Sequence, residues 1–217
     1  MNKIAVYTGL FTDDPNKLYG DIIHYEHDII NYTHNKDKID YIAFTNSDHL
    51  KSDFWDVRKI DTWRNGRWTA RKCKTSPQEL LPEYDAWLWM DNQLFFTYEE
   101  TQAALGRKPE RDKPETLINQ AKQYESEGYP SGNGLYENGI LFRRNNEHTN
   151  NFNKLWFEET AKWNTEDQIS MMYSLWKTPK VRVNPIRKTF VEHDYKNKQL
   201  PLTDQFGCQS RTVKDVR

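Results

Sequence analysis

An apolar run that stops at a carboxylate is the feature that most constrains this chain. Residues 84–90 read Tyr-Asp-Ala-Trp-Leu-Trp-Met, and Asp91 follows them directly. A strand that is buried on both faces rarely contains a charged residue, because desolvating a carboxylate is costly unless a partner pairs with it. We therefore expect the strand to end at Asp91, at the edge of an open α/β sheet where ligands bind. A carboxylate there can hold a divalent cation, which in turn can hold a diphosphate. The alternative is an aspartate that only caps a turn.

Length and composition fit one α/β domain with a tail. The 217 residues have a mean hydropathy of -1.00, but 14% of them are aromatic, so large side chains can still build a core. A net charge of -1 gives no overall basic field for nucleic acid or membranes. The two cysteines lie far apart in no metal spacing, and no run reaches the roughly 18 apolar residues of a membrane span. We expect a cytoplasmic protein without a membrane anchor.

Strand and helix patterns alternate along the chain, which predicts an α/β fold with a mixed, mainly parallel sheet flanked by helices. The expected strands are 4–11, 39–45, 54–60, 84–90, 139–144 and 181–186. The expected helices are 68–81, 99–105, 115–127, 148–163 and 165–176, the first of them interrupted at Pro77.

Basic residues gather in one segment of this otherwise balanced chain. Between residues 58 and 74 there are seven basic side chains and one acid, Asp61. Arg67, Arg71 and Lys74 recur at i, i+4 and i+7 and would share one face of a helix. Arginine forks suit phosphate oxygens, so this face is a candidate for binding a diphosphate. The alternatives are a solvated helix surface and a nucleic-acid-binding patch.

Four ordered segments span most of residues 4–176 and together resemble one family. They are Val-Tyr-Thr-Gly-Leu-Phe at 6–11, Tyr-Ile-Ala-Phe-Thr-Asn at 41–46, Arg-Trp-Thr-Ala-Arg-Lys-Cys-Lys at 67–74 leading to Leu-Trp-Met-Asp at 88–91, and 135–144 followed by Glu-Asp-Gln-Ile-Ser at 166–170. The set resembles the predicted glycosyltransferases of GT-A-like fold related to plant pollen and mucilage proteins. One departure concerns the metal: Asp91-Asn92-Gln93 lacks the second carboxylate of an Asp-x-Asp pattern.

The resemblance implies a single GT-A-like, Rossmann-related domain over residues 1–188, with a polar tail at 189–217 that would close the active site. It implies transfer of a sugar from a nucleotide-sugar donor, such as a UDP-sugar, to a hydroxyl acceptor. The acceptor would be a glycan or a modified nucleobase in DNA. A Mn²⁺ or Mg²⁺ ion would be held by Asp91, Gln93 and His193.

The remaining candidate residues are assigned to three tasks. Asp167, at the start of a late helix, would be the base that deprotonates the acceptor; the alternatives for it are helix-dipole stabilisation and acceptor binding. Glu137 is a second acid that would bind hydroxyl groups. The donor would contact the ends of the first two strands, the basic helix face and one amide: Thr8, Gly9, Thr45, Arg67, Arg71, Lys74 and Gln168. Gly9 would let the backbone approach the nucleotide closely.

Two other functions fit the same residues. The missing second carboxylate is equally expected of a non-catalytic GT-A-like module that binds a nucleotide or glycan. The basic segment 58–74 is equally expected of a nucleic-acid-binding protein.

Overall fold

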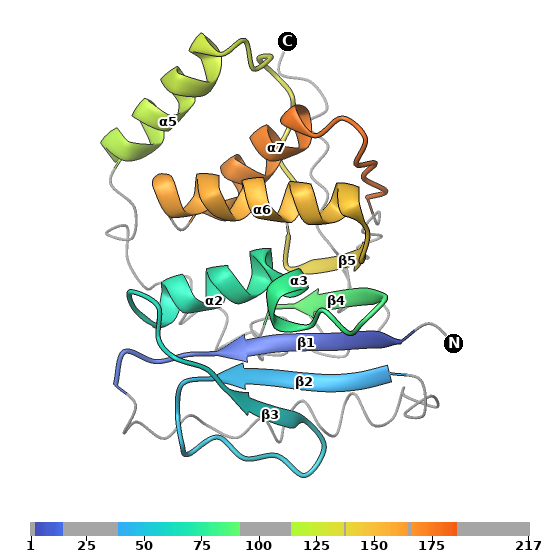
Figure 1. The fold of residues 1–217 in the computed structure, drawn as a ribbon. Coiled ribbons are helices and arrows are strands. Elements are labelled where there is room, and N and C mark those ends of the chain that lie inside the picture. Colours follow the sequence, from blue (N-terminus) through green and yellow to red (C-terminus); the bar gives the residue numbers. More distant parts are fainter. Residues whose placement is uncertain (1–2, 15–38, 92–113, 137, 165, 186–217) are drawn as a thin grey trace, which may run out of the picture. The chain divides into compact units, whose positions relative to one another are not determined.

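The computed structural model describes residues 3–14, 39–91, 114–136, 138–164 and 166–185 (Figure 1). The chain forms two compact units. The first comprises residues 1–95 and 139–150, and the second comprises residues 96–138 and 151–217. The expected boundary at residue 188 and the expected helix 99–105 lie outside the described residues.

The first unit is built on a five-stranded sheet with the strand order β3-β2-β1-β4-β5. Four strands run parallel and the last is antiparallel to its neighbour: β1 (Ile4–Leu10), β2 (Ile39–Thr45), β3 (Asp56–Lys59), β4 (Ala86–Met90) and β5 (Ile140–Arg144). The expected α/β class with a mixed, mainly parallel sheet is therefore confirmed.

The order of the strands creates a switch point beside β1. The chain leaves β1 for β2 and β3 on one side, then returns across it to β4 on the other. β1 pairs with β4 only as far as Tyr7, opposite Trp89, whereas it pairs with β2 to its last residue, Leu10. In such sheets the crevice beyond the carboxyl ends of the strands, at the reversal of order, is the usual ligand site.

One face of this sheet carries the core of the first unit. Alternate residues of β1, β2 and β4 point to the same side and pack with residues from the following helices, as a period of two requires. The cluster contains Ala5, Tyr7, Ile42, Phe44, Cys73, Leu81, Tyr84, Trp87 and Trp89. The helices are α2 (Gly66–Thr75), which contacts β1, and the short α3 (Pro77–Leu80). Pro77 opens α3, so the expected interruption is confirmed; proline at a helix start loses no hydrogen bond.

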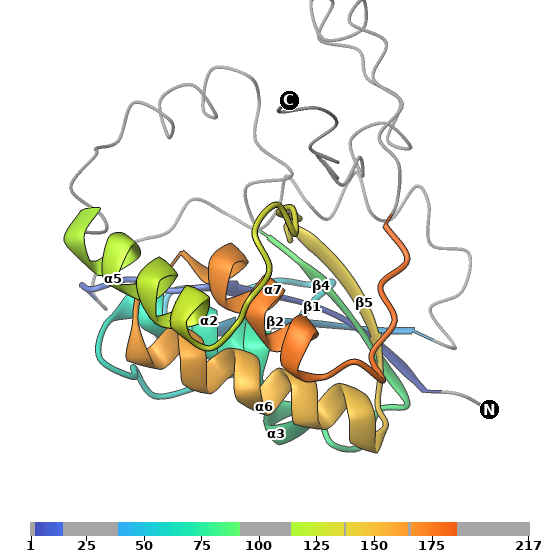
Figure 2. The same cartoon turned by 90° about the horizontal axis from the view of Figure 1, so that it is seen from above.

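The secondary-structure elements described in the second unit are all helices. It contains α5 (Pro114–Ser126), most of α6 (Glu147–Lys162) and α7 (Asp167–Lys177), which lie side by side in both views (Figures 1 and 2). The fully buried Gln120 links them: its amide donates to the Tyr124 hydroxyl and the Ser170 hydroxyl, both at 3.0 Å. Its carbonyl accepts from Asn164 at 2.8 Å.

The strand expected at 181–186 is wrong for the residues that are described. Residues 181–185 have no strand structure, and residues 182–185 are exposed. Their alternation of Val181 and Val183 with polar residues suggested a strand, but Val183 is 40% exposed and Pro185 has no amide hydrogen to donate. Among the helices that the structure describes, none is long and apolar enough to cross a bilayer.

Replacing Gln120 with leucine should lower the free energy of unfolding by about 2–3 kcal/mol, because Asn164 and Ser170 would lose a buried partner. The control is Gln123→Leu, one turn along α5, where the side chain is exposed and donates to the Glu127 carboxylate. That change should cost less than about 0.5 kcal/mol. Urea unfolding measures both, and equal losses would contradict the role assigned to the buried network.

Candidate functional site at the carboxyl end of β4

Asp91 directly follows β4, at the switch point, and its carboxylate is held by two side chains. The Trp89 indole N–H donates to Oδ1 at 2.6 Å. The Lys74 ammonium lies 3.2 Å from the same oxygen and 3.5 Å from Oδ2. The Asp91 backbone N–H donates to the Gly139 carbonyl at 2.8 Å, which ties this residue to the start of β5. Asp91 therefore does more than cap a turn.

The two partners of this ion pair differ in exposure. The Lys74 side chain is 0% exposed, whereas that of Asp91 is 29% exposed. Lys74 cannot reach solvent, so it acts through Asp91, which faces outward. Because Oδ1 already accepts from two donors, Oδ2 is the oxygen better able to bind a hydroxyl group or a cation.

The main chain of Lys74 is bound as firmly as its side chain. Its carbonyl oxygen accepts from the Tyr7 hydroxyl at 3.3 Å and from Arg143 Nη2 at 2.5 Å, and Arg143 also donates to Tyr7 at 2.7 Å. Burial raises the pKa of Tyr7, an effect that nearby Arg143 partly opposes, so Tyr7 stays neutral. Burial also lowers the pKa of Arg143, with Tyr7 opposing the change. Strands β1 and β5 thus meet at the end of α2.

The candidate residues at the ends of β1 and β2 are buried. Thr8 and Thr45 are 5% and 1% exposed, and the Thr45 hydroxyl accepts from the Ser47 backbone. A Cβ on Gly9 would lie 2.5 Å from the ring of Phe11, so that ring fills the space beside the glycine. The absence of a side chain at Gly9 therefore makes room for the Phe11 ring, at the place where we expected the nucleotide to approach the backbone.

Arg67, Arg71 and Lys74 all lie in α2, so the expected helix is confirmed there. Lys74 turns inward to Asp91, while Arg67 and Arg71 are half-buried nearer the helix start. That start is occupied by the chain itself, since the Asp13 carboxylate accepts from the Gly66 backbone N–H at 2.6 Å. The Gly66 N–H at the helix start is therefore already bound to Asp13 and does not offer a binding site for a diphosphate.

Asp167 and Gln168 belong to the second unit, in the first turn of α7. Asp167 is 2% exposed, and its backbone carbonyl accepts from the Trp156 indole at 2.8 Å. Gln168 is half-buried. An acid in the first turn also stabilises the helix dipole, so the three interpretations of Asp167, as a base, a helix-stabilising acid or an acceptor-binding group, all stay predictions.

Glu137, Gln93 and His193 lie outside the described residues. Within the described ranges, no three His, Cys, Asp or Glu side chains gather as a metal site would require.

Sequence reasoning missed Trp89, Tyr7 and Arg143. Trp89 lies two residues before Asp91, and a period of two places it on the same side of the strand, which is a signal that could have found it. Arg143 follows three apolar residues in β5, and a charge that is buried implies a partner. Tyr7 carries no such signal.

Comparison of the chain with protein-family models, with curated proteins and with solved structures finds no match.

The unequal burial of the ion pair predicts unequal effects of removing its members. Asp91→Asn would leave the buried Lys74 ammonium without its counter-charge, and should cost about 3 kcal/mol of stability. Lys74→Met would leave a carboxylate that water can reach, and should cost about 1 kcal/mol. The double variant should lose less than the two changes added together.

Urea unfolding of the three variants tests this order. Lys3→Met is the control, because Lys3 forms an exposed pair with Asp40 that should contribute less than about 0.5 kcal/mol. A larger loss for Lys74→Met than for Asp91→Asn would show that the buried ammonium does not depend on Asp91.

Proposed function

We propose that this chain is a glycosyltransferase that moves a sugar from a nucleotide-sugar donor to a hydroxyl acceptor. The observation that carries the proposal is the position of Asp91: a partly exposed carboxylate at the switch point of a mainly parallel sheet, held in place by Lys74 and Trp89. Ligands of α/β sheets bind at such points, and a fixed carboxylate suits sugar hydroxyls or a cation that carries a diphosphate.

Glycosyl transfer places three demands on a site. Charge building on the leaving diphosphate must be stabilised, the acceptor hydroxyl must lose a proton, and the two substrates must be aligned. Lys74 is balanced by Asp91, so the further positive charge of Arg143, which binds the Lys74 carbonyl, favours an anion near this pair. For the proton of the acceptor we propose Asp167.

We propose that Asp91 holds a Mn²⁺ or Mg²⁺ ion weakly, since no group of three metal-ligating side chains gathers within the described ranges. Such an ion commonly takes one or two carboxylates together with phosphate oxygens, so Asp91 alone can anchor it to the protein. When bound, it would act as a Lewis acid on the diphosphate. The Lys74 ammonium already balances part of the charge of Asp91, so we expect the ion to bind together with the nucleotide rather than before it.

A panel of UDP-, GDP-, ADP- and CMP-sugars, each with and without Mn²⁺, tests the proposal. One donor should raise the melting temperature and be hydrolysed slowly, with release of its nucleoside phosphate. Asp91→Asn should lower that turnover by at least about 100-fold, as expected when a group that stabilises developing charge is lost. Asp48→Asn, which changes an exposed carboxylate on the β2–β3 loop, should leave turnover unchanged.

Unfolding measurements on the same Asp91→Asn preparation establish that it is folded during the assay. Binding of no member of the panel would reject the glycosyltransferase. Full turnover by folded Asp91→Asn would remove Asp91 from the reaction.

The balance of charge at Asp91 makes a separate prediction about the metal. Mn²⁺ alone should bind the natural chain weakly, whereas Lys74→Met should bind Mn²⁺ alone roughly tenfold more tightly, because the competing ammonium is gone. Isothermal titration with Mn²⁺ in the absence of nucleotide measures this. Equal or weaker binding by Lys74→Met would show that the ion, if it binds, does so away from Asp91.

A further inference from the structure

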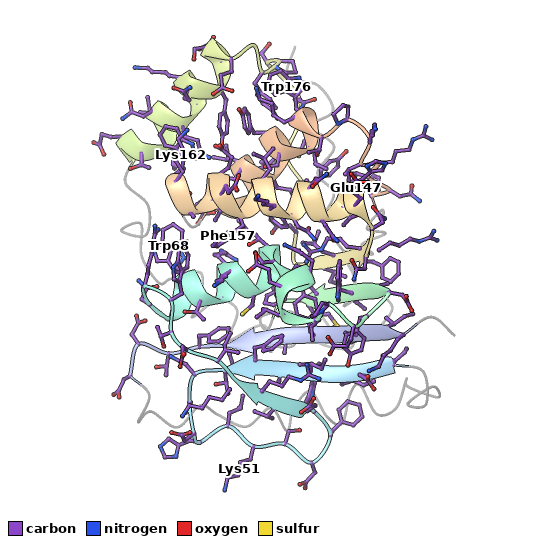
Figure 3. The ribbon with its side chains drawn as sticks, in the orientation of Figure 1. Lys51, Trp68, Glu147, Phe157, Lys162 and Trp176 are labelled. Atoms are coloured by element: carbon purple, nitrogen blue, oxygen red, sulfur yellow. The ribbon has the colours of Figure 1, made fainter. Side chains whose placement is uncertain are left out.

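Two tryptophans and an arginine form a cluster where the chain leads from β3 into the first turn of α2. The rings of Trp63 and Trp68 lie edge to face with centroids 5.7 Å apart. The Arg64 guanidinium carbon lies 4.4 Å from the centroid of Trp63 and 4.7 Å from that of Trp68. Trp68 lies in the first turn of α2 (Figure 3). We call these residues the Trp63–Arg64–Trp68 cluster.

Arg64 is held in a strained backbone conformation. Its φ of 64° is the one positive value among the described non-glycine residues. The Asn65 backbone N–H donates to the Trp63 carbonyl at 2.8 Å, which closes a γ-turn around Arg64. A γ-turn with positive φ is rare and strained, and glycine would adopt this φ with less strain. Such strain persists only where the surroundings enforce it, and it gathers at binding sites.

The surroundings of Arg64 enforce its conformation through hydrogen bonds. The Thr69 hydroxyl accepts from the Trp63 backbone N–H at 2.8 Å, and Asn65 Oδ1 accepts from the Trp68 backbone N–H at 3.0 Å. A Cβ on Gly66 would lie 3.0 Å from backbone atoms of Thr12, so the start of α2 is pressed against the chain leaving β1. The cluster is therefore fixed at the carboxyl edge of the parallel strands.

The charged residues of α2 are all basic. The helix holds Arg67, Arg71, Lys72 and Lys74, and it has no acid in its first turn. Cations near a helix N-terminus oppose the macrodipole, which favours acids there. Lys72 and Lys74 lie in the last turn, where the macrodipole favours cations, so Arg67 is the cation in this helix that it disfavours. Together with the strain at Arg64, the positive charge of Arg64, Arg67 and Arg71 near the start of α2 favours an anionic ligand.

We infer that the Trp63–Arg64–Trp68 cluster, with Arg67 and Arg71, binds single-stranded nucleic acid. Aromatic rings offer stacking partners to bases, and guanidinium groups suit phosphodiesters and stack on rings themselves. A neutral glycan carries no negative charge for these cations to bind. A duplex does not expose the faces of its bases, because they are stacked on one another within the helix.

This inference rests on the proposed function only for the biological role of the surface: in a glycosyltransferase, the bound strand would carry the acceptor hydroxyl. Binding itself does not depend on sugar transfer, so the two can fail separately.

Fluorescence anisotropy with a labelled single strand of about 12 nucleotides tests the inference. Arg64→Gly is the decisive variant, because glycine accepts the backbone conformation and the fold should be kept. It should weaken binding about tenfold and reduce the slope of log K against log salt by about 0.7, as for one lost phosphate contact on a single strand. Trp68→Ala should weaken binding by roughly fivefold or more through lost stacking.

Lys51→Ala is the matched control. It also removes one positive charge, but Lys51 is exposed on the β2–β3 loop, away from α2 in the view of Figure 3. It should change affinity less than twofold. Wild-type affinity in both cluster variants would overturn the inference. Equally tight binding of the same sequence as a duplex, or of a sulfated polysaccharide, would also overturn it, since any polyanion would then suffice.

The nucleotide-sugar panel run on the same preparation separates the two proposals. Single-strand binding without donor binding supports this surface and rejects the glycosyltransferase. Donor binding without single-strand binding rejects this surface alone.

Discussion

The arrangement of the first unit depends on one buried cation. A fully buried ammonium is prohibitively costly without a counter-charge, so Lys74 must face Asp91, and the end of α2 must lie against the end of β4. The carbonyl of the same residue accepts from Tyr7 and Arg143, which brings β1 and β5 to this point. The interactions that hold four elements together therefore also orient the partly exposed Asp91 carboxylate at the switch point.

The last turn of α2 stabilises the fold, whereas its start carries backbone strain. At its last turn, Lys74 is matched by Asp91, and Cys73 and Thr75 are buried. At its start, the strained Arg64 precedes the helix and Arg67 opposes the macrodipole, although Asp13 and Asn65 satisfy backbone N–H groups there. The ion pair at the last turn stabilises the fold, whereas the strain at Arg64 costs stability. Features that folding does not require are where function is most readily sought.

Local pattern was enough to predict most of the elements. The apolar run ending at Asp91 gave β4 and its edge, and Pro77 gave the start of α3, because each depends on neighbours in sequence. The partners of Lys74 could not be predicted in the same way. Helical spacing placed it with Arg67 and Arg71, whereas tertiary contact turned it inward. The prediction of a strand at 181–185 was wrong for the converse reason. The apolar and polar residues alternate there, but the segment does not pair with the sheet.

The position of α2 between the two proposed sites limits how they could work together. Ten residues at about 1.5 Å each separate the ends of the helix by about 15 Å. A strand stacked on Trp63 and Trp68 would therefore not place those same bases over Asp91. Any nucleotide that reacts there would have to be a different one from those that stack, reaching toward the switch point along the carboxyl edge of the sheet. Stacking would then determine where the strand lies, and Asp91 would determine where the donor lies. Loss of the cluster should consequently impair binding of the acceptor without altering binding of the donor.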